Sequence, residues 1–228
     1  MISNKIQHIF FDLDHTLWDF EKNSALAMRQ VFEIHQPNVD CDVFLQHYVD
    51  INFQYWERYR KDEITQQQLR YGRLKDTFVK VNCAASDAVI EKMSEDYIRL
   101  LPTYNYLFDG AVEILDYLQT KYKLHIITNG FHQVQNHKLT NSNINHYFET
   151  ITNSENAGVK KPHPAIFEYA LQIANADKAT SIMIGDCIDA DVRGALSCGL
   201  DAILFCSSEV SYPDVKQINH LSELKRYL

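Results

Sequence analysis

The sequence predicts an α/β protein, a doubly wound parallel sheet (Rossmann-like) carrying an inserted α-helical bundle. Two observations predict this class. In the second half of the chain, short apolar runs of the kind buried in parallel sheets alternate with helical stretches. From about Trp18 to Leu100, in contrast, helical periodicity recurs without a convincing strand. The 228 residues are sufficient for such a core with an insertion.

Four apolar runs are the expected strands. They lie at 9–11, 124–128, 182–184 and 202–205. Apolar residues recur at helical spacing over 111–122, 166–174 and 188–196, and Pro164 suits the first turn of the second of these helices. Strands that alternate with helices in this way predict a parallel sheet with right-handed crossovers.

The insertion is expected to be a four-helix cap. Its helical periodicity covers 25–32, 44–59, 69–78 and 89–100, with loops near 36–42, 61–65 and 82–86 and with Thr65 as an N-cap. We therefore expect a catalytic core of 1–16 and 101–228 and a cap of 17–100. Because ligands bind beyond the carboxyl ends of parallel strands, a cap inserted after the first strand is a candidate lid.

Composition narrows the function classes. The net charge of -8, without a basic stripe, disfavours a nucleic acid polymer as a partner. Five cysteines without a metal-like spacing indicate reduced thiols buried as small hydrophobic residues. No apolar run approaches the roughly 18 residues that a membrane span needs, and no signal segment is evident, so we expect a cytoplasmic protein. A monomer and a weak homodimer both stay open.

The first chemical motif is the acid pair Asp12 and Asp14, which follows the first apolar run and precedes Thr16. On a regular strand, residues two apart share one face. Two close carboxylates do not ionise equally, so one becomes a nucleophile or ligand and the other an acid. A simple turn that favours Asp is the alternative, which the flanking residues make less attractive.

A second and a third motif supply anion-binding groups. Thr128, Asn129 and Gly130 follow the second expected strand and offer a hydroxyl and backbone N–H groups, although Thr-Asn-Gly is also a common turn sequence. Lys161, held before Pro162, can neutralise a phosphoryl group; we prefer it to Lys160.

The fourth motif is Gly185-Asp186 at the end of the third expected strand. Mg²⁺ takes one or two protein carboxylates plus water and substrate oxygens, so Asp12 and Asp186 are the expected carboxylate ligands. Asp191 is expected behind them, orienting water or Lys161. Asp189 is interpreted as an acid that complements a helix N-terminus.

Together these motifs resemble the haloacid dehalogenase superfamily of phosphotransferases. Its signatures are matched in order by Asp12/Asp14/Thr16, Thr128, Lys161 and Asp186/Asp191, and its helical first-position cap is similar to the insertion. The stretch Leu13–Phe20, the Thr128-Asn129-Gly130 turn and the Tyr-Trp-Glu-Arg-Tyr cap helix look most like the pyrimidine 5′-nucleotidase branch.

The resemblance implies a mechanism. Asp12 would form an aspartyl-phosphate, and Asp14 would act as acid and then as base, with Thr16 as a supporting residue. Mg²⁺ would bind the Asp12 carboxylate, the Asp14 backbone carbonyl and the Asp186 carboxylate. The phosphoryl oxygens would be held by Thr128, Asn129, Gly130 and Lys161.

One departure from the family pattern is His15, where the superfamily often has Gly or Asp. On a regular strand its side chain faces away from the acid pair, so the substitution would be tolerated.

Several alternatives remain. A 2-haloacid dehalogenase would lack the second acid of the first motif and the counterpart of Asp186. A non-enzymatic phospho-acceptor domain would be about half this length, without the insertion. A sugar-phosphate phosphatase or phosphomutase is distinguished only by its products. The sequence thus predicts a Mg²⁺-dependent phosphomonoester hydrolase, with nucleoside 5′-monophosphates as favoured substrates.

Substrate specificity is not readable from the cap sequence. Its aromatic residues at helical spacing are more typical of a core than of a base-stacking platform. Two arginines of the third cap helix, Arg70 and Arg73, are interpreted as solvated rather than as substrate contacts.

Overall fold

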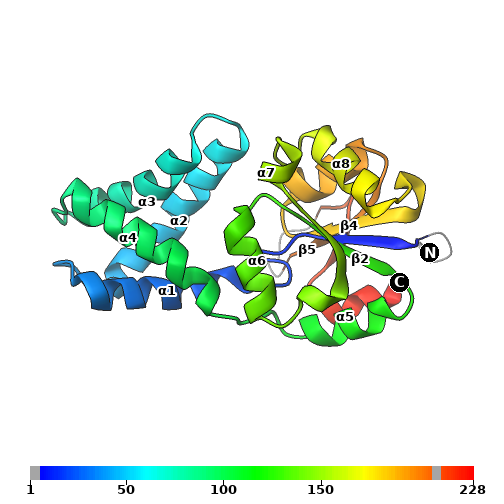
Figure 1. The fold of residues 1–228 in the computed structure, drawn as a ribbon, viewed down its shortest axis with the longest axis horizontal. Helices are drawn as coiled ribbons and strands as arrows, with labels where there is room; N and C mark the ends of the chain where they lie inside the picture. The colour runs from blue at the N-terminus through cyan, green and yellow to red at the C-terminus, as the bar shows by residue number, and fades with distance from the viewer. Residues whose placement is uncertain (1–5, 207–211) are drawn as a thin grey trace. The chain divides into compact units, whose positions relative to one another are not determined.

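The computed structural model describes residues 6–206 and 212–228, which form two compact units (Figure 1). The core unit holds the N-terminal segment up to Phe20 together with Asn105–Leu228, and the cap unit is Glu21–Tyr104. Both divisions fall four residues after the expected ones. The reason is that the linking segments bond to each other: the Asp19 N–H donates to the Tyr106 carbonyl at 3.1 Å, and the Phe108 N–H to the Leu17 carbonyl at 3.0 Å.

The core unit is built on a parallel six-stranded sheet in the order β3-β2-β1-β4-β5-β6, which confirms the predicted fold class. Its central strand β1 (His8–Phe11) is buried along its whole length, as the apolar run 9–11 predicts. The other strands are β2 (Lys123–Thr128), β3 (Phe148–Asn153), β4 (Ser181–Gly185), β5 (Asp201–Phe205) and β6 (Lys216–Ile218). The terminal strands β3 and β6 were not predicted.

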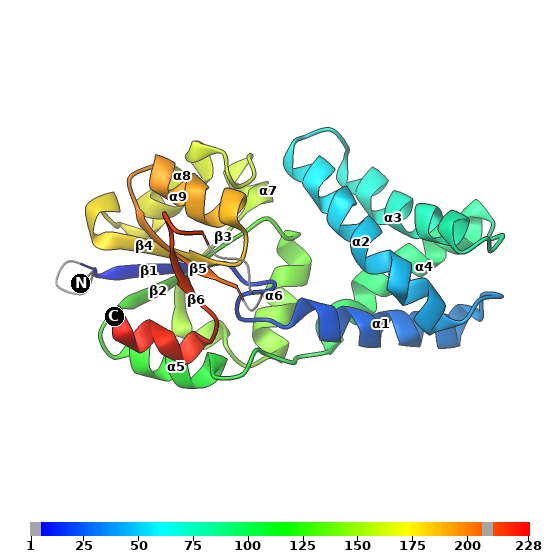
Figure 2. The ribbon, with the colours of Figure 1, turned by 180° about the vertical axis from the view of Figure 1, so that it is seen from behind.

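Helices cover both faces of this sheet. Figures 1 and 2 show α8 (Pro164–Ala174) and α9 (Gly194–Ser197) on one face, and α5 (Ala111–Gln119) with the C-terminal 3₁₀ turn η5 (Leu221–Arg226) on the other. The remaining core elements are α6 (His132–Asn141), η2 (Asn145–Tyr147), α7 (Ser154–Ala157), η3 (Lys178–Thr180) and η4 (Ile188–Arg193). The helix predicted over 188–196 is present, and its first part, η4, is a π-helix that continues into α9.

One apolar cluster joins α8 to the sheet. Phe167 is fully buried there with Phe10 of β1, Ile127 of β2 and Met183 of β4. These strands reach α8 through alternate side chains on one face, so a single helix fixes three strands. Pro164 opens α8 at its first turn, as predicted.

The cap unit contains the four predicted helices. They are α1 (Phe20–His35), α2 (Cys41–Arg60), α3 (Gln66–Lys80) and α4 (Asp87–Leu100), followed by the short turn η1 (Leu101–Thr103). Thr65 caps α3 in a capping box with Gln68, as the sequence predicts in part. Phe44 is the centre of an aromatic core and contacts Phe32, Tyr48 and Phe78.

The interpretation of Arg73 as a solvated residue is wrong, because its side chain is 2% exposed within the cap unit. Its guanidinium donates to the Asn52 side-chain oxygen at 2.8 Å. The rings of Tyr48 and Tyr97 lie 5.9 and 4.9 Å from it. An amide acceptor and two aromatic faces therefore replace water around this buried cation.

Among the described residues, no helix has the length and hydropathy of a membrane span.

Candidate active site

Three of the four motifs meet at the carboxyl edge of the central strands. Strand β1 pairs with β2 on one side and with β4 on the other, and Phe11 is in register with Ile126 and Ile184. The Asp12 N–H continues this ladder to the Ile184 carbonyl at 2.9 Å. The side chains that follow each strand therefore converge, as parallel topology requires.

Lys161 joins this edge from the loop after α7, and its ammonium meets three oxygens. The Nζ atom lies 2.6 Å from an Asp12 carboxylate oxygen, 2.6 Å from an Asp191 carboxylate oxygen and 2.6 Å from the Ile127 carbonyl. All of these groups are buried, and Lys161 is 2% exposed. The ammonium thus fixes the loop and the two acids to one point at the end of β2.

Burial and mutual repulsion shift the pKa values of this cluster. Burial raises the pKa of Asp12 well above its ordinary value, opposed by Lys161 and reinforced by Asp191 and Asp186. Burial also raises the pKa of Asp186 to about 7, again with Asp191 adding to the effect. Burial alone would lower the pKa of Lys161, but the carboxylates of Asp12 and Asp191 outweigh it and hold the lysine charged.

The donor set fits a divalent cation. Carboxylate oxygens of Asp12, Asp186 and Asp191 all lie within 4.8 Å of one another. When ionised, these three acids carry three negative charges against the single positive charge of Lys161. A dication would balance the remaining charge and favour the ionised form of Asp12, and hard carboxylate oxygens suit Mg²⁺.

Asp191 supports this cluster from behind. One carboxylate oxygen faces Lys161, and the other accepts the Cys187 N–H at 2.9 Å. Gly185 leaves the space for it, because a Cβ atom at Gly185 would lie 2.3 Å from the Asp191 carboxylate. Asp191 thus contacts Lys161 directly, and its role in orienting the lysine stays a prediction.

The hydroxyl of Thr128 is oriented by its neighbours. Its oxygen accepts the Gly130 N–H at 3.1 Å and the Gln135 side-chain amide at 2.6 Å. With both acceptor sites filled, the hydroxyl hydrogen is available to donate to a bound anion. Gly130 is needed because a Cβ atom there would lie 2.3 Å from the Gln135 amide nitrogen.

The structure changes the expected role of the Asn129 side chain. Its oxygen accepts the Lys161 N–H at 2.8 Å, and its amide donates to the Lys161 carbonyl at 3.0 Å. Both polar atoms are therefore committed to the backbone of the lysine loop. A contact from Asn129 to a phosphoryl group would come from its main-chain N–H, while its side chain holds Lys161 in place.

The acid pair does not lie on a regular strand. Strand β1 ends at Phe11, and the chain turns through Asp14 and His15, where His15 has a φ of 61°. That left-handed conformation explains why Gly or Asp suits this position, and the His15 ring packs 4.9 Å from that of Phe20. The argument that His15 faces away along a strand is therefore wrong. Beside the turn, the Thr16 hydroxyl donates to Asp186 at 3.5 Å.

Two site residues on α6 were missed by the sequence analysis. The Lys138 ammonium lies 2.5 Å from one Asp14 carboxylate oxygen, and the Gln135 amide donates to the other at 2.8 Å. Both side chains are buried, and they lie three residues apart on one helical face. No sequence pattern distinguishes these two residues, because most positions of α6 are polar.

Residues 6–199 match the family model described as haloacid dehalogenase-like hydrolase. The chain belongs to this family. The recognition from the four motifs is thereby confirmed, as is the prediction of a hydrolase. The site described above lies inside the matched range.

Named relatives cover most of this hydrolase. The pyrimidine 5′-nucleotidase YjjG of Escherichia coli K12 is 32% identical over 193 residues, 84% of this chain and 82% of the relative. The pyrimidine 5′-nucleotidase PynA of Streptococcus pneumoniae is 29% identical over 199 residues, 86% and 82% of the two chains. The crystal structure of the putative HAD-hydrolase YfnB from Bacillus subtilis, bound to magnesium, superposes with a TM-score of 0.88 at 28% identity and covers 98% of both chains.

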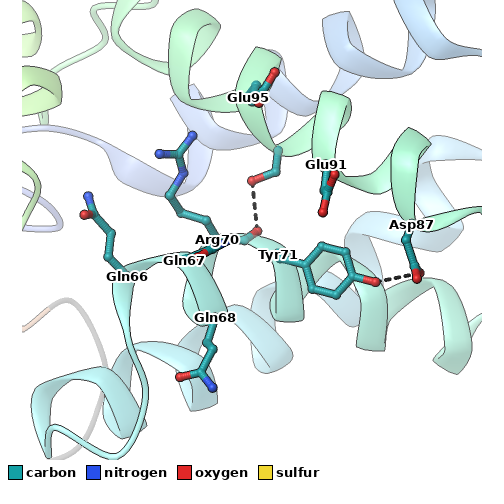
Figure 3. A pocket seen from close by; sticks show the side chains of 9 residues that line it. Gln66, Gln67, Gln68, Arg70, Tyr71, Asp87, Glu91 and Glu95 are labelled. Carbon is teal, nitrogen blue, oxygen red and sulfur yellow. Dashed lines mark hydrogen bonds between the residues drawn. The ribbon is translucent and has the colours of Figure 1, made fainter.

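The cap of this haloacid dehalogenase-like hydrolase has a polar pocket of its own, about 570 Å³ in volume (Figure 3). Glutamine amides, one guanidinium and three carboxylates line it, together with Tyr71 and Ser94; the residues are Gln66, Gln67, Gln68, Arg70, Tyr71, Asp87, Glu91, Ser94 and Glu95. The Tyr71 hydroxyl and Lys75 both donate to Asp87, so that carboxylate is already partnered. Arg70 lines the same pocket and is half-buried, so it is less solvated than the sequence interpretation assumed.

Proposed function

We propose that this hydrolase is a Mg²⁺-dependent phosphomonoesterase that acts through an aspartyl-phosphate and prefers pyrimidine nucleoside 5′-monophosphates. The observation that carries the chemistry is the convergence of Asp12, Lys161 and Asp186 at the carboxyl edge of β1, β2 and β4. The substrate preference is supported by the two pyrimidine 5′-nucleotidases among the relatives.

In the first step, a carboxylate oxygen of Asp12 attacks phosphorus. The bond from phosphorus to the ester oxygen breaks, and Asp14 gives its proton to the departing nucleoside hydroxyl. The Thr128 hydroxyl and the Lys161 ammonium stabilise the charge on the phosphoryl oxygens. A bound Mg²⁺, held by Asp12, Asp186 and the Asp14 carbonyl, would neutralise phosphoryl charge and keep Asp12 ionised.

In the second step, Asp14 takes a proton from a water molecule that attacks the phosphorus of the aspartyl-phosphate. The bond between phosphorus and the Asp12 oxygen breaks, which releases inorganic phosphate and restores both carboxyl groups. A phosphomutase would instead pass the phosphoryl group to a second substrate hydroxyl. Inorganic phosphate as the product therefore separates the two outcomes.

The test is phosphate release from a panel of UMP, CMP, dTMP, AMP, a hexose phosphate and phosphoglycolate, with Mg²⁺ and with a chelator. We expect the highest kcat/KM for a pyrimidine nucleotide, and loss of turnover on chelation. Asp12→Asn should lower kcat by on the order of 10³-fold or more, because the nucleophile is removed.

The matched control is Asp189→Asn. Asp189 lies in the same acidic segment but is 72% exposed and pairs with Arg193 at the surface. We expect unchanged turnover from this variant. Full turnover by Asp12→Asn would refute the aspartyl-phosphate, activity in chelator would refute the metal, and a best substrate among the sugar phosphates would refute the nucleotide preference. Halide release from a 2-haloacid would instead identify a dehalogenase.

A further inference from the structure

Two side chains of α6 hold the carboxylate of Asp14. The Lys138 ammonium lies 2.5 Å from one oxygen of Asp14, and the Gln135 amide donates to the other oxygen at 2.8 Å. A carboxylate has about four lone-pair sites, two on each oxygen. One donor on each oxygen fixes the plane of the group and leaves one site on each oxygen for a substrate or a water.

The burial of this cluster is asymmetric. The side chain of Lys138 is 2% exposed, whereas that of Asp14 is 20% exposed. The rings of Trp18 and Phe20 lie 4.3 and 5.3 Å from the ammonium, so aromatic faces contribute to its environment where water is excluded. The cation is thus enclosed, and the carboxylate is the member of the pair that stays accessible to a ligand.

Gln135 also connects Asp14 to the anion-binding turn. The same amide nitrogen that donates to Asp14 donates to the Thr128 hydroxyl oxygen at 2.6 Å. Its own side-chain oxygen is buried without a hydrogen-bond partner. A buried acceptor left unpaired costs free energy, and apolar residues of similar size would avoid that cost. The amide is therefore placed for its donor contacts to Asp14 and Thr128.

We infer that Lys138 and Gln135 are positioning residues for proton transfer to the leaving group. They hold the Asp14 carboxyl so that an oxygen site not used by their donors presents the proton to the ester oxygen in the first step and accepts a proton from the attacking water in the second. This inference rests on the proposed function, since it assigns a purpose to the proton transfer by Asp14. Neither residue touches the reacting phosphorus.

The test exploits the leaving group. An alkyl ester such as UMP needs protonation of a poor leaving group, whereas p-nitrophenolate departs from its phosphate ester with little help. The value of kcat/KM reports the steps up to formation of the phosphoenzyme, so it includes leaving-group departure and excludes hydrolysis of the intermediate. We expect Lys138→Met to lower kcat/KM for UMP by roughly 10²-fold and that for p-nitrophenyl phosphate by less than about 3-fold.

Gln135→Met tests the second donor without changing charge, and it decides the question if Lys138→Met does not fold. It should lower kcat/KM for UMP more than that for p-nitrophenyl phosphate, but both should fall, because Gln135 also orients the Thr128 hydroxyl. Equal losses on both esters, or no loss on either, in a variant of unchanged Tm would overturn the inference. Lys216→Met is the control, because Lys216 forms a surface pair with Asp201 and should leave both esters unaffected.

Asp14→Asn separates this inference from the proposed function. If Asp14→Asn loses UMP turnover selectively while Lys138→Met and Gln135→Met do not, only the positioning role of Lys138 and Gln135 is refuted. If Asp14→Asn affects the two esters equally, the proposed acid itself is refuted. All three variants are compared at the same pH and Mg²⁺ concentration, and Tm is measured for each protein.

Discussion

Asp191 lies behind the proposed ligands and fixes the geometry of the site through two contacts. Its carboxylate receives the Cys187 N–H on one oxygen and faces the Lys161 ammonium with the other. The first contact fixes the turn after β4, and the second fixes the lysine loop. A single buried acid therefore holds together two segments that lie 26 residues apart in the chain, at Lys161 and Cys187.

At the residue scale, Asp191→Asn tests this function. An amide accepts through one atom only, so either the backbone N–H or the ammonium loses its partner. We expect a loss of roughly 1.5–3 kcal/mol in the free energy of unfolding, because the bond lost is buried and charged. Turnover should fall about 10- to 100-fold, the usual effect of changing a residue behind the ligands. Urea unfolding and steady-state kinetics measure both.

Asp189→Asn is the control here as well, since its exposed ion pair with Arg193 should contribute less than about 1 kcal/mol. If Asp191→Asn kept the stability and the turnover of the natural chain, Lys161 would be held by Asp12, Asn129 and the Ile127 carbonyl alone.

At the element scale, strands β1 and β2 carry a buried histidine pair. The pair consists of His8 and His125, and a ring nitrogen of one lies 3.0 Å from a ring nitrogen of the other. The second ring nitrogen of His125 lies 2.9 Å from the Thr150 hydroxyl oxygen of β3. Burial lowers the pKa of His125 to about 4, and His8 and Lys123 add to the effect. The pKa of His8 is also lowered by burial and Lys123, against Glu149.

The sign of the pH dependence follows from these shifts. The unfolded chain binds a proton at His125 near pH 6.5, whereas the folded chain resists it until about pH 4. The contribution of His125 to the free energy of unfolding is therefore fully present above pH 6.5 and is lost as the pH falls toward 4. We expect His125 to account for a loss of about 2 kcal/mol between pH 7.5 and 5.0.

Urea unfolding in a Trp56→Phe background measures this, because Trp18 then reports on the core unit alone. In His125→Gln the acid-dependent loss should be smaller by about the same amount, even though the variant is less stable at pH 7.5. An unchanged loss in His125→Gln would assign the acid sensitivity to the carboxylates instead.

The elements also show what the sequence could reveal and what it could not. The four interior strands were predicted because a short apolar run such as 9–11 in β1 is typical of a strand buried on both faces. Strand β3 was missed because its sequence, Phe-Glu-Thr-Ile-Thr-Asn, is partly exposed at the sheet edge, and β6 has only three residues. Helix α6 was missed because its polar sequence has no apolar periodicity, and with it Gln135 and Lys138 were lost.

The candidate site likewise contains residues that the sequence could predict and residues that it could not. The predictable ones follow strands or stiff turns, so topology indicates that they converge; they are Asp12, Thr128, Lys161, Asp186 and Asp191. A buried lysine such as Lys138, in contrast, looks like a surface lysine in sequence. The side-chain role of Asn129 depends on a loop conformation that no sequence pattern specifies.

At the scale of the whole molecule, the charge of the site should couple metal binding to folding. The protein has a net charge of -8, and its core unit concentrates Asp12, Asp186 and Asp191 around Lys161. A cation that binds only the folded chain raises the free energy of unfolding, by about 2.7 kcal/mol at a hundredfold excess over Kd. We expect saturating Mg²⁺ to raise Tm by roughly 5 °C or more, measured by calorimetry without substrate.

Asp186→Asn should abolish this rise, because it removes one of the two proposed carboxylate ligands. Without Mg²⁺ the variant should be as stable as the natural chain or more so, since burial and Asp191 already raise the pKa of the Asp186 carboxyl to about 7. Asp189→Asn should keep the full rise, and KCl at matched ionic strength should produce none. A rise that survives in Asp186→Asn would locate the cation at other residues and remove the metal from the proposed mechanism, whatever the kinetics of the loaded enzyme.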